Sequence, residues 1–198
     1  MTMSLHHRYV YDWSHGTHCA GLVGAINNNG VGISSIGGGV TLMGVRGANN
    51  NEELLYCING VAWAANNGAK VISMSFGSTG DSYAERTTLQ SCYNNGVILV
   101  AAAGNEGDQG NEINYPAGYS FVISVASVDS NGKLSDFSQY GSGRADVAAP
   151  GGFQIYNYGG TDYEIVNILS TTYCKSQYLR IYGLEDIDRD RKSGSAGM

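Results

Sequence analysis

Charge is scarce in this chain, and long apolar runs are missing. Only 14% of the 198 residues are charged. The Lys and Arg residues form no block, so a surface for nucleic acid or for anionic lipid has little electrostatic support. No run of about 18 apolar residues occurs, and a membrane-spanning helix needs one. We therefore expect neither a nucleic-acid partner nor a membrane partner.

Metal-site spacing and a secretory signal are also missing. The four cysteines, Cys19, Cys57, Cys92 and Cys174, contain no C-x-x-C pair, which disfavours a zinc site. Cys57 and Cys92 each lie on an apolar helical face, which favours buried, unpaired thiols, with a Cys57–Cys92 disulfide as the alternative. The N-terminus, Met1 to Arg8, has no apolar segment after its charges and so is not a signal peptide.

What is present suits a compact domain, because 42% of the residues are apolar and the 29 glycines show no collagen-like period. β-rich segments at 71–75, 97–103 and 121–128 alternate with two helical patterns. One helix is expected to start near Glu52 and the other to span 83–95. This alternation predicts an α/β fold with a parallel sheet covered by helices on both faces. We expect a further strand over 40–45.

One stretch combines a capping hydroxyl, two histidines and two glycines: Ser14-His15-Gly16-Thr17-His18-Cys19-Ala20-Gly21. Ser14 suits the N-cap of a helix whose first residue is His15, and Cys19, Leu22, Val23 and Ile26 then share one apolar face. Glycine is unfavourable inside a helix, so its density here indicates that backbone or substrate approaches closely. His15 is thus expected at an exposed helix mouth.

This stretch resembles the histidine motif of the subtilisin-like serine proteases, the subtilase family, and Cys19 resembles the proteinase K branch. The resemblance implies that His15 is the general base, that His18 supports it and that Cys19 is a buried thiol. A second similarity is Val97-Ile98-Leu99-Val100-Ala101-Ala102-Ala103-Gly104-Asn105-Glu106-Gly107. In subtilases the matching asparagine donates a hydrogen bond to the oxyanion, and subtilisin itself is the example on which the rate effect of such a donor was measured. The resemblance implies this role for Asn105.

Two further segments resemble the walls of the subtilase pocket for the residue before the scissile bond. They are Ser75-Phe76-Gly77 and Ala102-Ala103-Gly104, and both fall where a predicted strand ends. The resemblance implies that substrate backbone pairs there as an added strand. Small residues leave room for a large side chain and Glu106 would favour a basic one, so we expect broad specificity. Tyr115-Pro116-Ala117 resembles a family turn with a cis prolyl bond, although trans bonds are commoner.

The loop Asn27-Asn28-Asn29-Gly30-Val31-Gly32 resembles loops that hold calcium in many subtilases. The resemblance implies a structural calcium with Asn28 as a ligand, and a plain turn is the alternative because the loop has no carboxylate. The chemistry itself requires no cofactor. The resemblance also implies protein or peptide substrates, a monomer and an extracellular location.

The similarity runs from about Asp12 to Thr172, but two family segments are not recognised. Subtilases carry an aspartate before the histidine and a serine in Gly-Thr-Ser-Met-Ala-x-Pro after it. Ser193 and Ser195 lie in a similar context with Ala196 at the serine position, and they are the candidates for the nucleophile. We therefore expect a fold truncated at both ends and a chain that is incomplete or inactive.

The expected organisation is an irregular stretch at 1–11, a subtilase-like catalytic core at 12–173 and a charged tail at 174–198 that is non-native or disordered. The function implied is a serine endopeptidase that uses an acyl-enzyme. The alternative is a peptide-binding module without chemistry. A nucleotide-binding domain is disfavoured, because Gly37-Gly38-Gly39 precedes a strand instead of joining a strand to a helix.

Overall fold

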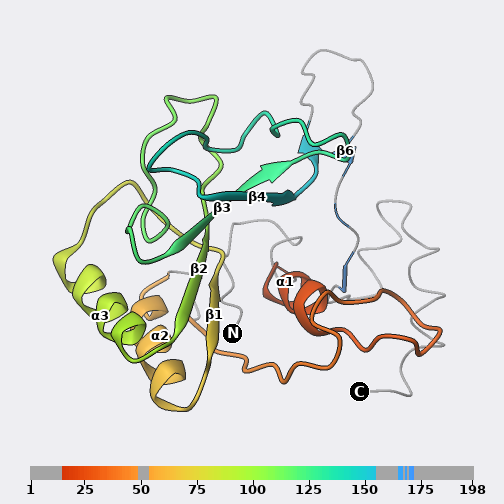
Figure 1. The fold of residues 1–198 in the computed structure, drawn as a ribbon, viewed down its shortest axis with the longest axis horizontal. Coiled ribbons are helices and arrows are strands. Elements are labelled where there is room, and N and C mark those ends of the chain that lie inside the picture. The colour runs from red at the N-terminus through yellow and green to blue at the C-terminus, as the bar shows by residue number, and fades with distance from the viewer. Residues whose placement is uncertain (1–14, 49–53, 155–164, 167, 169, 172–198) are drawn as a thin grey trace. The chain divides into compact units, whose positions relative to one another are not determined.

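The computed structural model describes residues 15–48, 54–154, 165–166, 168 and 170–171. The chain divides into two compact units. Figure 1 colours the described residues from red at the N-terminus to blue at the C-terminus. Of the described residues, the larger unit comprises those from 43 to 168, and the smaller unit comprises 15–42 and 170–171. Among the described helices, none has the length and apolar character needed to cross a membrane.

A four-stranded sheet lies at the centre of the larger unit. Its order is β1-β2-β3-β4, and each neighbouring pair is parallel. The strands are β1 (Val71–Met74), β2 (Ile98–Ala102), β3 (Ile123–Val128) and β4 (Val147–Pro150). The α/β class and the parallel sheet are thus confirmed, and the predicted strands at 71–75, 97–103 and 121–128 are present in slightly shorter form.

Burial along the strands follows the period of two that the pleat imposes. In β1, Ile72 and Met74 are fully buried whereas Val71 is 49% exposed. In β2, Leu99 and Ala101 are buried in the same alternation. One face of the sheet therefore builds the core, and this alternation fixes the register of β1 against β2.

Two helices pack against each other and against this sheet. They are α2 (Cys57–Asn66), which contacts β1, and α3 (Tyr83–Asn94), which contacts β2 (Figure 1). The predicted end of α3 is confirmed, because Gly96 follows this helix with a positive φ of 83°. The predicted start of α2 near Glu52 is wrong. Residues 54–56 are not helical, and the Tyr56 N–H donates to the Gly47 carbonyl at 2.9 Å instead.

Two cysteines are buried on these helices. Cys57 lies on α2 and Cys92 on α3, and each is only 5% exposed. Both are free thiols, which confirms the favoured reading and excludes the Cys57–Cys92 disulfide. Burial raises the pKa of Cys57 to about 11, and the charge on Glu85 adds to this rise against an opposing backbone hydrogen bond.

Helix α1 (His15–Gly24) belongs to the smaller unit and begins at His15, as predicted. The predicted apolar face is wrong. The helix ends before Ile26, which is 63% exposed, and Val23 is 37% exposed. Its one buried residue is Gly21, so close backbone approach decides this packing instead of an apolar stripe.

The predicted strand over 40–45 is also wrong, because Gly44 alone forms a β-bridge there. Val40 and Leu42 are 47% and 39% exposed, so no buried face fixes a ladder. A short antiparallel pair, β5 (Phe153–Gln154) and β6 (Ile165–Val166), completes the described elements. The expected domain limits near residues 11 and 173 lie outside the described residues.

Candidate active site

The carboxyl ends of β1 and β2 bring two predicted segments together. Met74 pairs with Ala101 in the parallel register. Two segments therefore lie side by side at the carboxyl ends of these strands, here called the strand-end edge: Ser75-Phe76-Gly77 and Ala102-Ala103-Gly104. Phe76 and Ala103 are buried, at 7% and 2% exposure, whereas Gly77 and Ala102 are exposed. The buried side chains anchor the edge, and the exposed positions between them leave backbone accessible.

Asn105 follows directly, in a bend, and is exposed. Its backbone N–H donates to Glu106 Oε2 at 3.0 Å. The Glu106 side chain therefore folds back on the loop, although the sequence suggested that it would attract a basic substrate side chain. An exposed asparagine at the carboxyl end of a parallel strand is placed to donate its amide to a bound carbonyl.

Gln139 braces this loop and was not found by sequence reasoning. Its Nε2 donates to Glu106 Oε2 at 3.0 Å and to the Glu112 carbonyl at 3.5 Å. Its Oε1 accepts the Glu106 N–H at 3.2 Å. Gly104 has a φ of 122°, and a Cβ added there would lie 2.5 Å from Gln139 Nε2 and 2.6 Å from Gln139 Cδ. Only glycine therefore fits at position 104.

Residues that follow the Asn105 loop pack against Gly77 and Ser78. Ser78 and Tyr115 form an antiparallel bridge, with N–H to carbonyl distances of 2.9 and 2.7 Å. A Cβ added to Gly77 would lie 2.7 Å from the Tyr115 carbonyl oxygen and 2.8 Å from both polar atoms of the Asn114 amide. The Tyr115–Pro116 bond is cis, as in the family turn that this segment resembles and against the commoner trans form.

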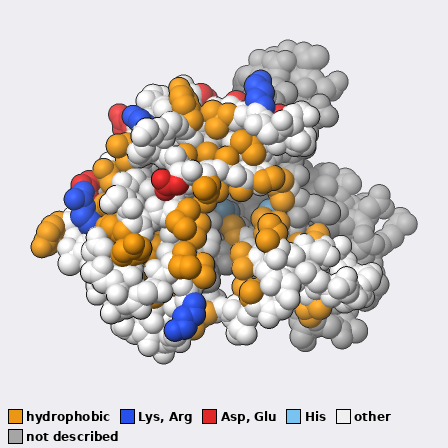
Figure 2. Space-filling model, in the orientation of Figure 1, with side chains coloured by type: hydrophobic (Ala, Val, Ile, Leu, Met, Phe, Trp, Pro, Cys, Tyr) orange, Lys and Arg blue, Asp and Glu red, His pale blue; other side chains and the backbone are white. Residues whose placement is uncertain are grey.

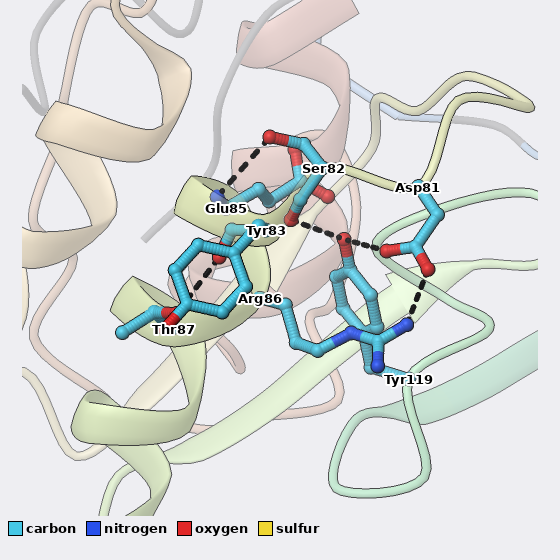
Figure 3. Close-up of polar contacts among 7 residues, drawn as sticks. All are labelled: Asp81, Ser82, Tyr83, Glu85, Arg86, Thr87 and Tyr119. Carbon is cyan, nitrogen blue, oxygen red and sulfur yellow. Dashed lines mark hydrogen bonds and ion pairs between the residues drawn. The ribbon is translucent and has the colours of Figure 1, made fainter.

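A polar cluster at the start of α3 joins the segment that follows Gly77 to the segment that follows Pro116 (Figure 3). The Ser82 Oγ accepts the Glu85 N–H at 3.4 Å and caps the helix. The Tyr119 hydroxyl lies 3.4 Å from Asp81 Oδ1 and 3.3 Å from the Ser82 carbonyl. Arg86 pairs with Asp81 and lies over the Tyr119 ring, 5.3 Å from its centroid. The segment after Gly77 is thereby fixed to the one after Pro116.

Glu85 and Tyr119 carry perturbed pKa values in this cluster. Burial raises the pKa of Glu85 and the charge on Asp81 adds to the rise, whereas a hydrogen bond from Tyr119 opposes it. Glu85 Oε1 is buried and accepts no hydrogen bond within the described part of the chain. Burial and the charge on Glu85 also raise the pKa of Tyr119 to about 12. The carboxyl of Glu85 is therefore held in an environment that favours its protonated form.

His15 lies in the first turn of α1, in the smaller unit. Its Nε2 is 3.9 Å from the Cys19 Sγ, one helical turn further on. The Ser170 hydroxyl donates to the His18 carbonyl at 2.6 Å, and the Thr171 hydroxyl donates to the Thr17 carbonyl at 2.7 Å. These bonds hold the first turn of α1, in which His15 is half-buried and not at an exposed helix mouth as expected.

The same two residues explain one glycine of the histidine motif. A Cβ added to Gly21 would lie 2.6 Å from the Ser170 hydroxyl oxygen and 3.0 Å from the Thr171 nitrogen. A segment remote in sequence therefore approaches α1 closely, as the glycine density predicted. The candidate nucleophiles Ser193 and Ser195 lie outside the described residues.

The loop around Asn28 offers only neutral oxygen donors. Asn28 is exposed, with a positive φ of 60°. The Asn27 side chain is engaged by Ser35, accepting its N–H at 2.7 Å and donating to its carbonyl at 3.1 Å. Within the described residues, no group of three His, Cys, Asp or Glu side chains is placed to hold a metal. These donors by themselves do not fit a calcium site, which usually includes carboxylates.

A groove of about 510 Å³ lies between α2 and α3 and was not predicted. Lys70 and Val97, which immediately precede β1 and β2, are among the residues that line it. It therefore lies at the amino ends of the strands, away from Asn105. Its walls otherwise carry alanine, threonine, serine and asparagine side chains around Cys92, and none of the lining residues is a His, Asp or Glu.

The parallel sheet and the helices that pack on it define an α/β protein. A sequence model of the Subtilase family matches residues 5–183, and the chain belongs to this family. It is 42% identical over 151 residues to thermitase of Thermoactinomyces vulgaris, a match that covers 75% of this chain and 53% of thermitase. It is 38% identical over 157 residues to subtilisin DY of Bacillus licheniformis, covering 77% of this chain and 57% of that protein.

Solved structures give the same result. The subtilisin-like protease Apa1 from the Antarctic psychrotroph Pseudoalteromonas sp. AS-11 superimposes with a TM-score of 0.61 at 36% identity, over 73% of this chain and 33% of that one. A protease of Pseudoalteromonas arctica PAMC 21717 gives a TM-score of 0.66 at 32% identity, over 79% of this chain and 53% of that one. The chain spans about half the length of the curated relatives that it matches.

Proposed function

We propose that this chain carries part of the active site of a serine endopeptidase and binds peptide substrates at the edge formed by β1 and β2. One observation supports this above the others. The register of the two strands presents Ser75–Gly77 and Ala102–Gly104 side by side, and Asn105 follows directly. An extended peptide laid along this edge would have one of its carbonyls beside the Asn105 amide.

The reaction is acyl transfer. A serine hydroxyl attacks the scissile carbonyl, and His15 accepts its proton as the new C–O bond forms. The negative charge that develops on the carbonyl oxygen is stabilised by the Asn105 side-chain amide. His15 then gives the proton to the leaving amine as the C–N bond breaks, and water hydrolyses the acyl-enzyme by the same steps. Ser193 and Ser195 are the candidates for the nucleophile.

The surface of the described residues favours protein or peptide substrates over polyanions. On the face that Figure 2 shows, Lys and Arg side chains occur singly, and hydrophobic side chains occupy much of the area between them. The formal net charge is −6. The charge pattern supports a proposal without a nucleic-acid or membrane partner. The family resemblance supports extending it to a monomer that acts outside the cell.

A structural calcium near Asn28 is a separate part of the proposal. The described loop would need carboxylates from elsewhere, because it offers amide and carbonyl oxygens alone. The measurement is the thermal midpoint with calcium and with a chelator. A rise with calcium that disappears in Asn28→Ala is expected, and equal midpoints would remove the metal from the account.

The second candidate function is a peptide-binding module without chemistry. It rests on the same strand-end edge, and it is favoured by Ala196 at the position where the family motif has its serine. The two candidates differ in one step only, because the module binds peptides without forming an acyl-enzyme.

A fluorophosphonate probe on the purified 198-residue chain, followed by peptide mapping, separates these candidates. The endopeptidase requires label on a single serine, and that label must disappear in His15→Ala, because the histidine activates the nucleophile. His7→Ala is the control, since it changes a histidine that lies outside the histidine motif. A chain that binds peptides but takes up no label, beside a fully labelled control subtilase, is the module.

A further inference from the structure

The Asn105 loop is held by a side chain that lies 33 positions further along the chain. Gln139 is completely buried, and its amide makes contacts with both the side chain and the backbone of Glu106. The same amide also donates to the Glu112 carbonyl at 3.5 Å. A buried amide whose hydrogen bonds are satisfied constrains the segments that it joins. One of these segments is the loop that carries the proposed oxyanion donor.

Successive backbone groups around Asn105 are each held by this arrangement. The Gln139 N–H donates to the Gly104 carbonyl at 3.4 Å. The Asn105 N–H donates to Glu106 Oε2, and the Glu106 N–H donates to Gln139 Oε1. The peptide planes on both sides of Asn105 are therefore fixed. Because Asn105 is itself exposed, this backbone constraint decides where its side chain can reach.

Glu106 acts as the intermediate between the two residues. Its Oε2 atom accepts from both the Asn105 N–H and Gln139 Nε2, at 3.0 Å each. A displacement of the Gln139 amide would therefore remove a donor from the carboxylate that holds Asn105. Gly104 allows the amide to approach this closely, since any side chain there would occupy the position of Gln139.

We propose that Gln139 is a positioning residue for catalysis, which acts through Glu106 to hold the Asn105 side chain where the oxyanion forms. This inference deepens the proposed function and rests on it. Glutamine is the residue required, because it supplies an acceptor for the Glu106 N–H and a donor for the Glu106 carboxylate. Glutamate would meet that carboxylate with a like charge, and methionine would supply neither group.

The first test is amide hydrogen exchange by nuclear magnetic resonance on the full chain. Gln139→Met is expected to lower the protection of the Asn105 and Glu106 N–H groups by about tenfold or more. Gln139→Glu keeps the volume and serves as the second variant if methionine impairs folding. The matched control is Asn111→Asp, because the Asn111 amide also joins these loops, with Nδ2 donating to the Tyr140 carbonyl at 3.1 Å. Unchanged protection, or an equal loss in Asn111→Asp, would overturn the proposal.

The second test separates positioning from general loss of structure. A peptidyl phosphonate is used as the probe, because its reaction with an active serine places negative charge where the oxyanion forms. The Gln139 variants are expected to react about tenfold more slowly or worse, while the dissociation constant of a non-reactive peptide changes less than about twofold. A rate loss matched by an equal loss of peptide affinity contradicts the proposal. If the unmodified chain takes up no label, the endopeptidase proposal fails, and the exchange measurement alone decides whether Gln139 holds Asn105.

Discussion

Substituting Gly104 with alanine tests whether the Asn105 loop is built as described. Gly104 has a φ of 122°, and its added Cβ would overlap the buried Gln139 amide. Gly110 is a matched control in the same region, because its φ is 118° and a Cβ there would meet nothing within 4 Å. Both substitutions impose the same backbone strain, and only Gly104→Ala displaces a neighbouring side chain.

The difference between the two variants follows from the contacts that would be lost. A non-glycine residue in this backbone region costs about 1 to 3 kcal/mol, which applies to both positions. Displacing the Gln139 amide removes its bonds to Glu106, each worth about 1 kcal/mol net, and leaves buried polar atoms unpaired. We therefore expect Gly104→Ala to lower the free energy of unfolding by about 3 kcal/mol more than Gly110→Ala does.

Urea unfolding followed by far-ultraviolet circular dichroism measures both variants, provided that the slopes agree. A third variant, Gly104→Ala with Gln139→Ser, identifies the cause. Serine is too short to occupy the overlapping volume, so the added cost of Gly104→Ala should largely disappear when it is measured against Gln139→Ser alone. Equal destabilisation by Gly104→Ala and Gly110→Ala would refute the packing of Gln139 against the loop.

Three further outcomes follow from the site and its surroundings. Because burial raises the pKa of Glu85, the folded chain is most stable with this carboxyl protonated and loses that stability as pH rises through the raised pKa. In urea titrations, Glu85→Leu should therefore stabilise the chain more at pH 8 than at pH 4. An equal gain at both pH values would show that the folded state does not disfavour the charged carboxylate. The Cys57 thiol, buried and with its pKa raised to about 11, should react with iodoacetamide at pH 8 only as fast as the chain opens, and reaction at the rate of a free thiol would contradict its burial. Asn105→Ala should slow phosphonate labelling by about 10² to 10³-fold, the range measured for the matching subtilase asparagine, with peptide affinity retained and with Asn131→Ala as an unaffected control.

Much of the fold and one edge of the site could be predicted because their signals are local. β-rich composition at 71–75 and 97–103 indicated strands, and Gly96 marked the end of α3. Parallel connection then required the carboxyl ends of both strands to lie side by side. Signals that depend on tertiary context were missed. The apolar spacing after Cys19 predicted a buried helix face, whereas contact with Ser170 and Thr171 at Gly21 determines how α1 packs.

The role of Gln139 in holding the Asn105 loop could not be predicted from the sequence, because it too depends on tertiary contacts. Gln139 lies between Ser138 and Tyr140 in a polar segment, and nothing near it indicates a buried amide that bonds to residue 106. The sequence predicts that Glu106 faces substrate, whereas its side chain is bound by Gln139 and by the Asn105 N–H, two groups that only the tertiary fold brings to it. The overlap that a Cβ at position 104 would make with the Gln139 amide explains why this position is glycine.

The central claim is that the strand-end edge of β1 and β2 binds an extended peptide beside Asn105. The most direct measurement is titration of the isotopically labelled chain with a non-reactive peptide, followed by backbone amide resonances. The account predicts saturable shifts at Ser75–Gly77 and Ala102–Asn105, with Gly96 and its neighbours at the opposite end of the sheet unaffected. Saturable shifts confined to the groove between α2 and α3, or no shifts at all, would contradict it.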